Sequence, residues 1–173
     1  VGWFASGRAA RMPADTALLQ IHASNPYGFA WLRRTTEENV DLNRNYVDFD
    51  QPLPENPNYE KYRHLICPAE WNDQVELDTS NEIARLMRDL PPMVMQGAIT
   101  SGQYVDPDGL FYGGVRPSWS RQTTEQIFAR FLGAAKRVAI VDYHTGLGPR
   151  GYGERICDGG PGNPGWERAN SWW

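Results

Sequence analysis

Two short apolar runs constrain the fold of this chain more than any other feature. Residues 17–23 and residues 138–143 consist mostly of apolar side chains, and turn-forming residues follow each run. Runs of this length and composition are typical of strands that are covered on both faces of a sheet. The pattern therefore predicts two buried strands, each of which ends where polar residues begin.

Helical patterns lie between these two runs. In residues 81–90, apolar side chains recur at positions i, i+3, i+4 and i+7, and Ser80 stands before them as a capping residue. A short helix is expected over residues 93–101. Another is expected over residues 123–136, where Thr123 begins a capping box. The third helix would deliver the chain to the second strand in the order that favours parallel pairing.

The predicted fold class is therefore α/β, with a mixed, largely parallel sheet and helices on both faces. Residues 25–71 are rich in proline and are predicted to form a long loop. The chain begins at Val1 and stops on Trp172-Trp173, bulky aromatics that further chain would normally cover. We therefore expect residues 1–173 to be the central part of a single domain, with a sheet that is incomplete at both ends.

Charge and hydropathy argue against two classes of partner. The chain carries 17 basic and 21 acidic residues, a net charge of −4, without the basic block that follows a phosphate backbone, so nucleic acid is not expected. No apolar run approaches the roughly 18 residues that span a bilayer, so a membrane is not expected either. Cys67 and Cys157 lack metal-site spacing and are expected to be buried thiols, with a disulfide as the alternative. The favoured location is cytoplasmic.

Two polar segments carry the candidate chemistry. Residues 39–46 hold Arg44 among three asparagines, and a guanidinium pairs with carboxylates in bidentate geometry. The alternative for Arg44 is a structural salt bridge, but three carboxamides favour a polar ligand. His144 follows the second predicted strand, and Asp142 would lie on the same face of that strand. Such a histidine serves as a metal ligand, as a base or as a hydrogen-bonded structural residue.

These motifs resemble a known superfamily of enzymes. Residues 25–29 (Asn-Pro-Tyr-Gly-Phe), 41–45 (Asp-Leu-Asn-Arg-Asn) and 142–145 (Asp-Tyr-His-Thr) follow in order the landmarks of zinc carboxypeptidases of the carboxypeptidase A type. Their aspartoacylase and succinylglutamate desuccinylase relatives share these landmarks. The chain is more similar to a little-characterised bacterial branch of the superfamily, through the longer runs at residues 25–34, 109–114 and 144–149. The resemblance covers essentially the whole chain.

The resemblance implies a role for four residues. His144 would be the last of three protein ligands to a catalytic Zn²⁺. Asn43 and Arg44 would bind the substrate carboxylate, and Arg44 would also polarise the scissile carbonyl. Asp41 would orient the first zinc histidine. The implied partner is a small-molecule or peptide substrate with a free carboxylate.

The sequence also departs from the superfamily. It has no His-x-x-Glu, the motif that supplies the first two zinc ligands, so two further ligands are expected upstream. The general-base glutamate is expected well beyond His144, where Glu154 and Glu167 both fall in a glycine-rich region. We therefore expect a zinc-dependent hydrolase in the full-length protein, cleaving an amide next to a free carboxylate, and an inactive chain in isolation. The alternatives are an N-acyl amino acid deacylase and a non-catalytic module that binds peptides or glycans.

Overall fold

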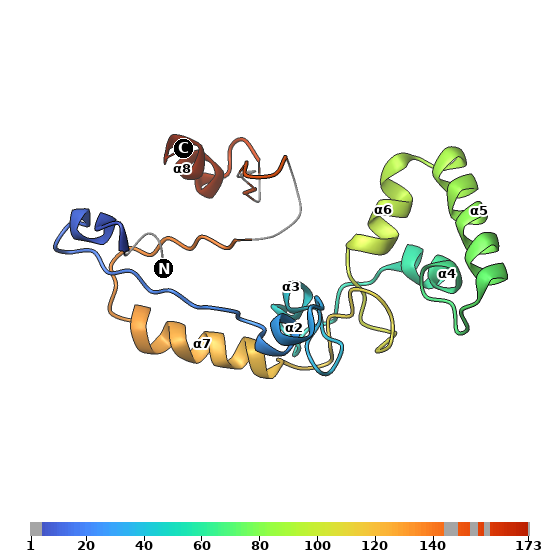
Figure 1. The fold of residues 1–173 in the computed structure, drawn as a ribbon, viewed down its shortest axis with the longest axis horizontal. Helices are drawn as coiled ribbons and strands as arrows, with labels where there is room; N and C mark the ends of the chain where they lie inside the picture. Colours follow the sequence, from blue (N-terminus) through green and yellow to red (C-terminus); the bar gives the residue numbers. More distant parts are fainter. Residues whose placement is uncertain (1–4, 144–148, 153–155, 158–159, 173) are drawn as a thin grey trace. The chain divides into compact units, whose positions relative to one another are not determined.

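The structure is a computed structural model that describes residues 5–143, 149–152, 156–157 and 160–172. Within these ranges the regular elements are helical (Figure 1). The chain divides into two compact units, Val1–Ala135 and Lys136–Trp173. No helix in the described ranges is both long and apolar enough to cross a bilayer. In chain order the elements are η1 (Arg8–Arg11), α2 (Pro26–Trp31), α3 (Leu42–Asn45), α4 (Pro57–Ile66), α5 (Asp73–Asp89), α6 (Pro92–Thr100), α7 (Trp119–Leu132) and α8 (Pro164–Trp172).

The predicted α/β fold class is wrong, because the described residues form no sheet. Their β pairing is limited to an isolated bridge between Gln103 and Tyr112. Residues 17–23 and 138–143, both predicted as buried strands, lie outside every helix and strand, and Val141 is 60% exposed. An apolar run supplies side chains for a sheet, but a strand also needs a neighbour that completes its hydrogen-bonded ladder.

Among the described helices, α2, α4 and α8 each begin at an Asn-Pro pair. The side-chain oxygens of Asn25, Asn56 and Asn163 accept hydrogen bonds from backbone N–H groups of the first turn, at 2.9, 2.9 and 2.8 Å. The proline that follows each asparagine has its φ fixed near the helical value and has no N–H to satisfy, so it suits the first helical position. The loop predicted over residues 25–71 is therefore wrong, since α2, α3 and α4 lie there.

The three predicted helices are confirmed, but two of them begin elsewhere. Helix α5 begins at Asp73, because the Asn72 side chain accepts from the N–H groups of the first turn, whereas the predicted cap Ser80 lies inside the helix. Helix α7 begins at Trp119 and not at Thr123, because Ser118 caps it. Helix α6 covers most of residues 93–101 as predicted.

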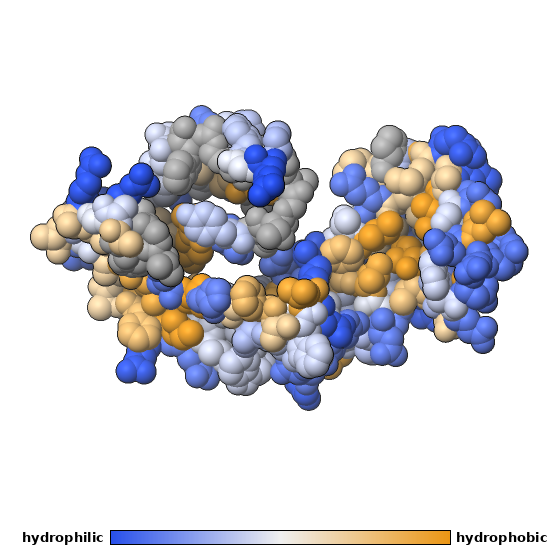
Figure 2. Space-filling model, in the orientation of Figure 1, coloured by the Kyte–Doolittle hydropathy of each residue, from blue (hydrophilic) through white to orange (hydrophobic). Residues whose placement is uncertain are grey.

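Helices α4, α5 and α6 pack around a small apolar core. Helix α4 contacts both of the other helices, and Figure 2 shows hydrophobic side chains gathered over this group. The periodic apolar face of α5 therefore packs on helices and not on the predicted sheet. The buried members of the core are Tyr62, Leu86, Met95 and Ala98, and the partly buried members are Leu65, Ile66, Ile83, Leu90 and Val94.

Several large side chains and both cysteines are more exposed than expected. Trp31, Trp71, Trp119 and Trp172 are between 59% and 70% exposed. The expected burial of both thiols is wrong, since Cys67 is half-buried and Cys157 is exposed. No disulfide joins these two described cysteines.

Candidate functional site

The predicted carboxylate-binding residues lie on α3, a helix of four residues that Asp41 caps. Oδ1 of Asp41 accepts a hydrogen bond from the backbone N–H of Asn43 at 3.0 Å, and the Asp41 N–H donates to the carbonyl of Tyr112 at 2.7 Å. Asn43 and Arg44 therefore occupy consecutive positions of one short turn. Asn43 is exposed and Arg44 is half-buried.

Asp41 also binds Arg34, a residue that no sequence pattern singled out. The Nε atom of Arg34 lies 2.9 Å from Oδ2 of Asp41, and the Asp41 side chain is 2% exposed whereas that of Arg34 is 49% exposed. A buried carboxylate of this kind requires a charged partner. Neither Nη atom of Arg34 has an acceptor within the described part of the chain, so this end of the guanidinium is open to a ligand.

The Arg44 side chain reaches the segment that follows α6. Its Nη2 donates to the carbonyl of Thr100, and its Nη1 donates to the carbonyl of Asn43 at 3.2 Å. A Cβ at position 102 would overlap Cδ of Arg44, and the φ of +89° at Gly102 also favours glycine. The Nε atom of Arg44 is buried, and no described residue accepts a hydrogen bond from it.

Tyr104 fixes the backbone of Arg44. The Tyr104 hydroxyl is half-buried and donates to the Arg44 carbonyl at 2.6 Å. Burial raises the pKa of this hydroxyl, and the positive charge of Arg44 opposes the shift only in part. The hydroxyl therefore keeps its proton, and its role as a donor, throughout the neutral range.

Phe111 lies next to both arginines. The Cζ atoms of Arg34 and Arg44 lie 5.0 and 5.9 Å from the centroid of the Phe111 ring, within the range of cation–π attraction. The backbone of Phe111 has a φ of +53°, a left-handed conformation that is costly for a residue other than glycine. The surrounding loop must therefore hold Phe111 in place.

Hydrogen bonds from buried and half-buried side chains fix this loop, which comprises residues 102–114. The Gln103 side chain makes four hydrogen bonds to backbone groups of the same loop. Asn39 donates to two loop carbonyls, at 2.9 and 3.1 Å. The Tyr59 hydroxyl donates to Asp106 at 3.0 Å, and burial together with this hydrogen bond raises the pKa of Tyr59. The loop is thus tied to both α3 and α4.

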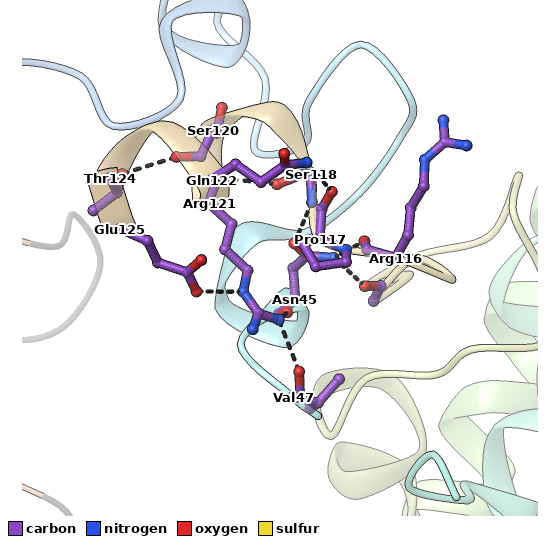
Figure 3. A network of polar contacts seen from close by, with 11 residues as sticks. Asn45, Val47, Arg116, Pro117, Ser118, Ser120, Arg121, Gln122, Thr124 and Glu125 are labelled. Atoms are coloured by element: carbon purple, nitrogen blue, oxygen red, sulfur yellow. Dashed lines mark hydrogen bonds and ion pairs between the residues drawn. The ribbon is translucent and has the colours of Figure 1, made fainter. Parts of the chain in front are cut away.

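Asn45 connects α3 to the start of α7 (Figure 3). Its Nδ2 donates to the carbonyls of Gly113 and Arg116 at 2.8 and 2.9 Å, and its Oδ1 accepts from the N–H of Ser118 at 2.8 Å. Arg121 donates to the Asn45 carbonyl from the first turn of α7. The carboxamides that suggested a ligand are therefore partly structural, since Asn39 and Asn45 bind the backbone.

The predicted zinc site stays a prediction. His144 lies outside the described residues, and Asp142 is described and exposed. Within the described ranges no three His, Cys, Asp or Glu side chains lie together as metal ligands. A catalytic zinc takes three protein ligands and keeps an open position, and two of these ligands were expected outside the described residues.

A family model with the description "Protein of unknown function (DUF2817)" matches residues 1–173. The chain belongs to this family. No curated protein and no solved structure matches the sequence. The DUF2817 match includes Arg34, Arg44 and Phe111, so the whole candidate site lies inside the family's region.

In this DUF2817 chain the site carries a surplus of positive charge. The guanidiniums of Arg34 and Arg44 lie beside the Phe111 ring. Within the described residues, Asp41 forms an ion pair with Arg34, and no carboxylate forms one with Arg44. Two positive charges and one negative charge leave a net charge of +1. The exposed Asn43 amide and the open end of Arg34 add hydrogen-bond donors. Such an arrangement favours a small anion.

Proposed function

We propose that this chain binds a free carboxylate of its ligand through Arg34 and Arg44. The observation that carries the proposal is the pair of guanidiniums over Phe111 with Asp41 as the partly neutralising carboxylate. Arg34 uses Nε for Asp41 and keeps both Nη groups for the ligand, in the geometry that suits a bidentate pair. Asp41 fixes the orientation of Arg34 without occupying its open end.

Arg44 supports this binding mainly through its charge. Each of its Nη groups carries two hydrogens, and the carbonyls of Asn43 and Thr100 accept from one Nη group each. The guanidinium therefore retains donors for a ligand at its edge. Asn43 offers an exposed carboxamide on the neighbouring position of α3.

We further propose that the ligand is the substrate of a hydrolase that cleaves the amide next to this carboxylate. This part rests on the resemblance of residues 41–45 and 142–145 to zinc carboxypeptidases, in which His144 would be a zinc ligand. A peptide and an N-acyl amino acid both place a free carboxylate beside an amide. A panel of both substrate types, assayed with the protein, separates a peptidase from a deacylase.

A non-catalytic binding module is the second candidate, and the exposed tryptophans are the feature that favours it. Trp31, Trp71 and Trp119 lie on α2, before α5 and on α7. The ring that contacts the arginines is that of Phe111. We therefore expect any aromatic platform to act beside the carboxylate site. A protein that binds the same ligands but hydrolyses none of them would establish this second function.

The test of carboxylate binding compares two ligands that differ in one group. N-acetylglycine carries the carboxylate, and N-acetylglycinamide replaces it with a neutral amide. We expect the chain to bind the acid and not the amide in a calorimetric or NMR titration. Arg34→Gln and Arg44→Gln should each weaken binding of the acid by about tenfold or more, since hydrogen bonds to charged groups contribute about 1.5–3 kcal/mol.

Arg130→Gln is the matched control for these two variants. Arg130 lies near the end of α7 and contacts Phe131, so the variant removes a guanidinium beside a ring outside the candidate site. Its affinity for N-acetylglycine should equal that of the wild type. Equal affinity of the wild type for the acid and the amide would refute carboxylate recognition.

A further inference from the structure

Phe111 combines three properties that its neighbours do not share. Its ring lies beside both arginines, its backbone is left-handed, and its side chain is half-buried. We propose that Phe111 is the positioning residue of the carboxylate site, and that its ring sets the spacing between the guanidiniums of Arg34 and Arg44. This inference rests on the proposed carboxylate binding and adds the element that organises it.

The backbone around Phe111 is anchored on both sides. The carbonyl of Phe111 accepts from the N–H of Gln103 at 3.1 Å, and the carbonyl of Tyr112 accepts from the N–H of Asp41 at 2.7 Å. The second of these bonds joins the loop to the residue that caps α3 and binds Arg34. A left-handed residue persists only where its surroundings enforce it. The loop and the arginine site are therefore built as one unit.

A phenyl ring has the chemistry that this position requires. The negative face of an aromatic ring attracts a guanidinium without cancelling its charge. A carboxylate at position 111 would hold the arginines equally well but would compete with the ligand for them. An aliphatic side chain would fill the space without attracting either cation. The ring also offsets part of the cost of the buried Nε of Arg44, which has no acceptor among the described residues.

The test uses variants that separate the ring face from its volume. Phe111→Leu removes the aromatic face, and Phe111→Tyr keeps it. Phe131→Leu is the matched control, because Arg130 lies 5.1 Å from the Phe131 ring centroid in a cation–π contact outside the site. Far-UV circular dichroism verifies folding of each full-length chain. If Phe111→Leu does not fold, Phe111→Met serves as the ring-free variant.

Two measurements are made on each variant. The Nε–Hε resonances of Arg34 and Arg44, assigned from the spectra of Arg34→Gln and Arg44→Gln, report their position against the ring, because a ring current shifts nearby protons. Titration with N-acetylglycine reports affinity. Phe111→Leu should shift both resonances and weaken binding by about tenfold, whereas Phe111→Tyr should stay within about twofold of the wild type. Phe131→Leu should change neither quantity.

Two outcomes overturn the inference. The first is that both arginine resonances are the same in Phe111→Leu as in the wild type, which would show that the ring does not place the guanidiniums. The second is that the resonances move while the affinity for N-acetylglycine is unchanged. If the wild type does not bind N-acetylglycine, the proposed carboxylate binding fails, and the resonances alone still decide whether Phe111 positions the two arginines.

Discussion

Asn43 and Asn45 stand two positions apart on the same short helix and have opposite environments. Asn43 is exposed, whereas Asn45 is fully buried and makes three side-chain hydrogen bonds to backbone groups. The chemistry of the two side chains is identical. Their roles differ because a buried carboxamide must satisfy both its donors and its acceptor within the protein.

The pair provides a direct test of this difference. Asn45→Asp keeps an acceptor for Ser118 but places an oxygen against two carbonyls that lose their donor, and it buries a charge. We expect a loss of about 3 kcal/mol or more in the free energy of unfolding, measured with urea. The matched variant Asn43→Asp should stay within about 0.5 kcal/mol of the wild type. Equal losses would contradict the assignment of Asn45 as the buried connector.

Ionisation of Tyr59 should lower the free energy of unfolding at alkaline pH. Burial and the hydrogen bond to Asp106 raise its pKa, so the folded chain holds this proton more tightly than the unfolded chain. Its contribution is complete below about pH 10, the usual pKa of tyrosine, and is lost as the pH rises above that value. Tyr59→Phe should therefore show a smaller loss of stability than the wild type between pH 9 and pH 11.

Urea unfolding at several pH values measures this dependence. Tyr143→Phe is the control, because the Tyr143 side chain is 93% exposed. The control should follow the wild-type curve. A Tyr59→Phe curve as steep as that of the wild type would show that other groups govern alkaline unfolding.

At the scale of residues, part of the candidate site was predicted from the sequence. Asp41, Asn43 and Arg44 are neighbours in a motif, and the structure places them on one capped turn. Their predicted roles, and that of His144, remain predictions. Arg34 and Phe111 were missed because their contact joins distant segments through a left-handed backbone, and residue types alone do not encode that conformation. Both residues lie in runs that the resemblance includes, 25–34 and 109–114, but neither run assigned them a role.

At the scale of elements, the three helices with a periodic or capped pattern were predictable, whereas α2, α3 and α4 and the starts of α5 and α7 were not. The apolar period of 3.6 identified α5 from residues 81–90, but its polar first turns carry no such signal. The strand predictions failed for a different reason, since pairing depends on a partner segment that periodicity does not reveal. Asn-Pro pairs held unused information, because three of them begin helices in the described chain.

The caps of α5 give a test at this scale. Asn72→Ala removes an acceptor for two N–H groups of the first turn and should cost about 1 kcal/mol of stability. Ser80→Ala lies within the helix on an exposed position and should be neutral or stabilising by up to about 0.5 kcal/mol. Thermal unfolding followed by circular dichroism distinguishes the two. A larger loss of stability for Ser80→Ala than for Asn72→Ala would indicate that the helix begins at Ser80, as predicted from the sequence.

At the scale of the whole molecule, the residues of the proposed carboxylate site lie within one of the two compact units. All of Arg34, Arg44 and Phe111 belong to Val1–Ala135. We therefore expect a chain that ends at Ala135 to fold cooperatively and to bind N-acetylglycine within about twofold of the affinity of the 173-residue chain. Urea unfolding and titration of both chains measure this. Loss of binding in a folded shorter chain would contradict the assignment of the site to Val1–Ala135.

The exposure of the tryptophans affects how well their fluorescence reports unfolding. Indole emission reports unfolding only when the ring passes from an apolar interior into water. Trp31, Trp71, Trp119 and Trp172 already face solvent in the folded chain. Their emission should lie at long wavelength before any denaturant is added and should change little afterwards. A weak fluorescence response of these four rings would therefore be the signature of the native surface and no sign of an unfolded sample.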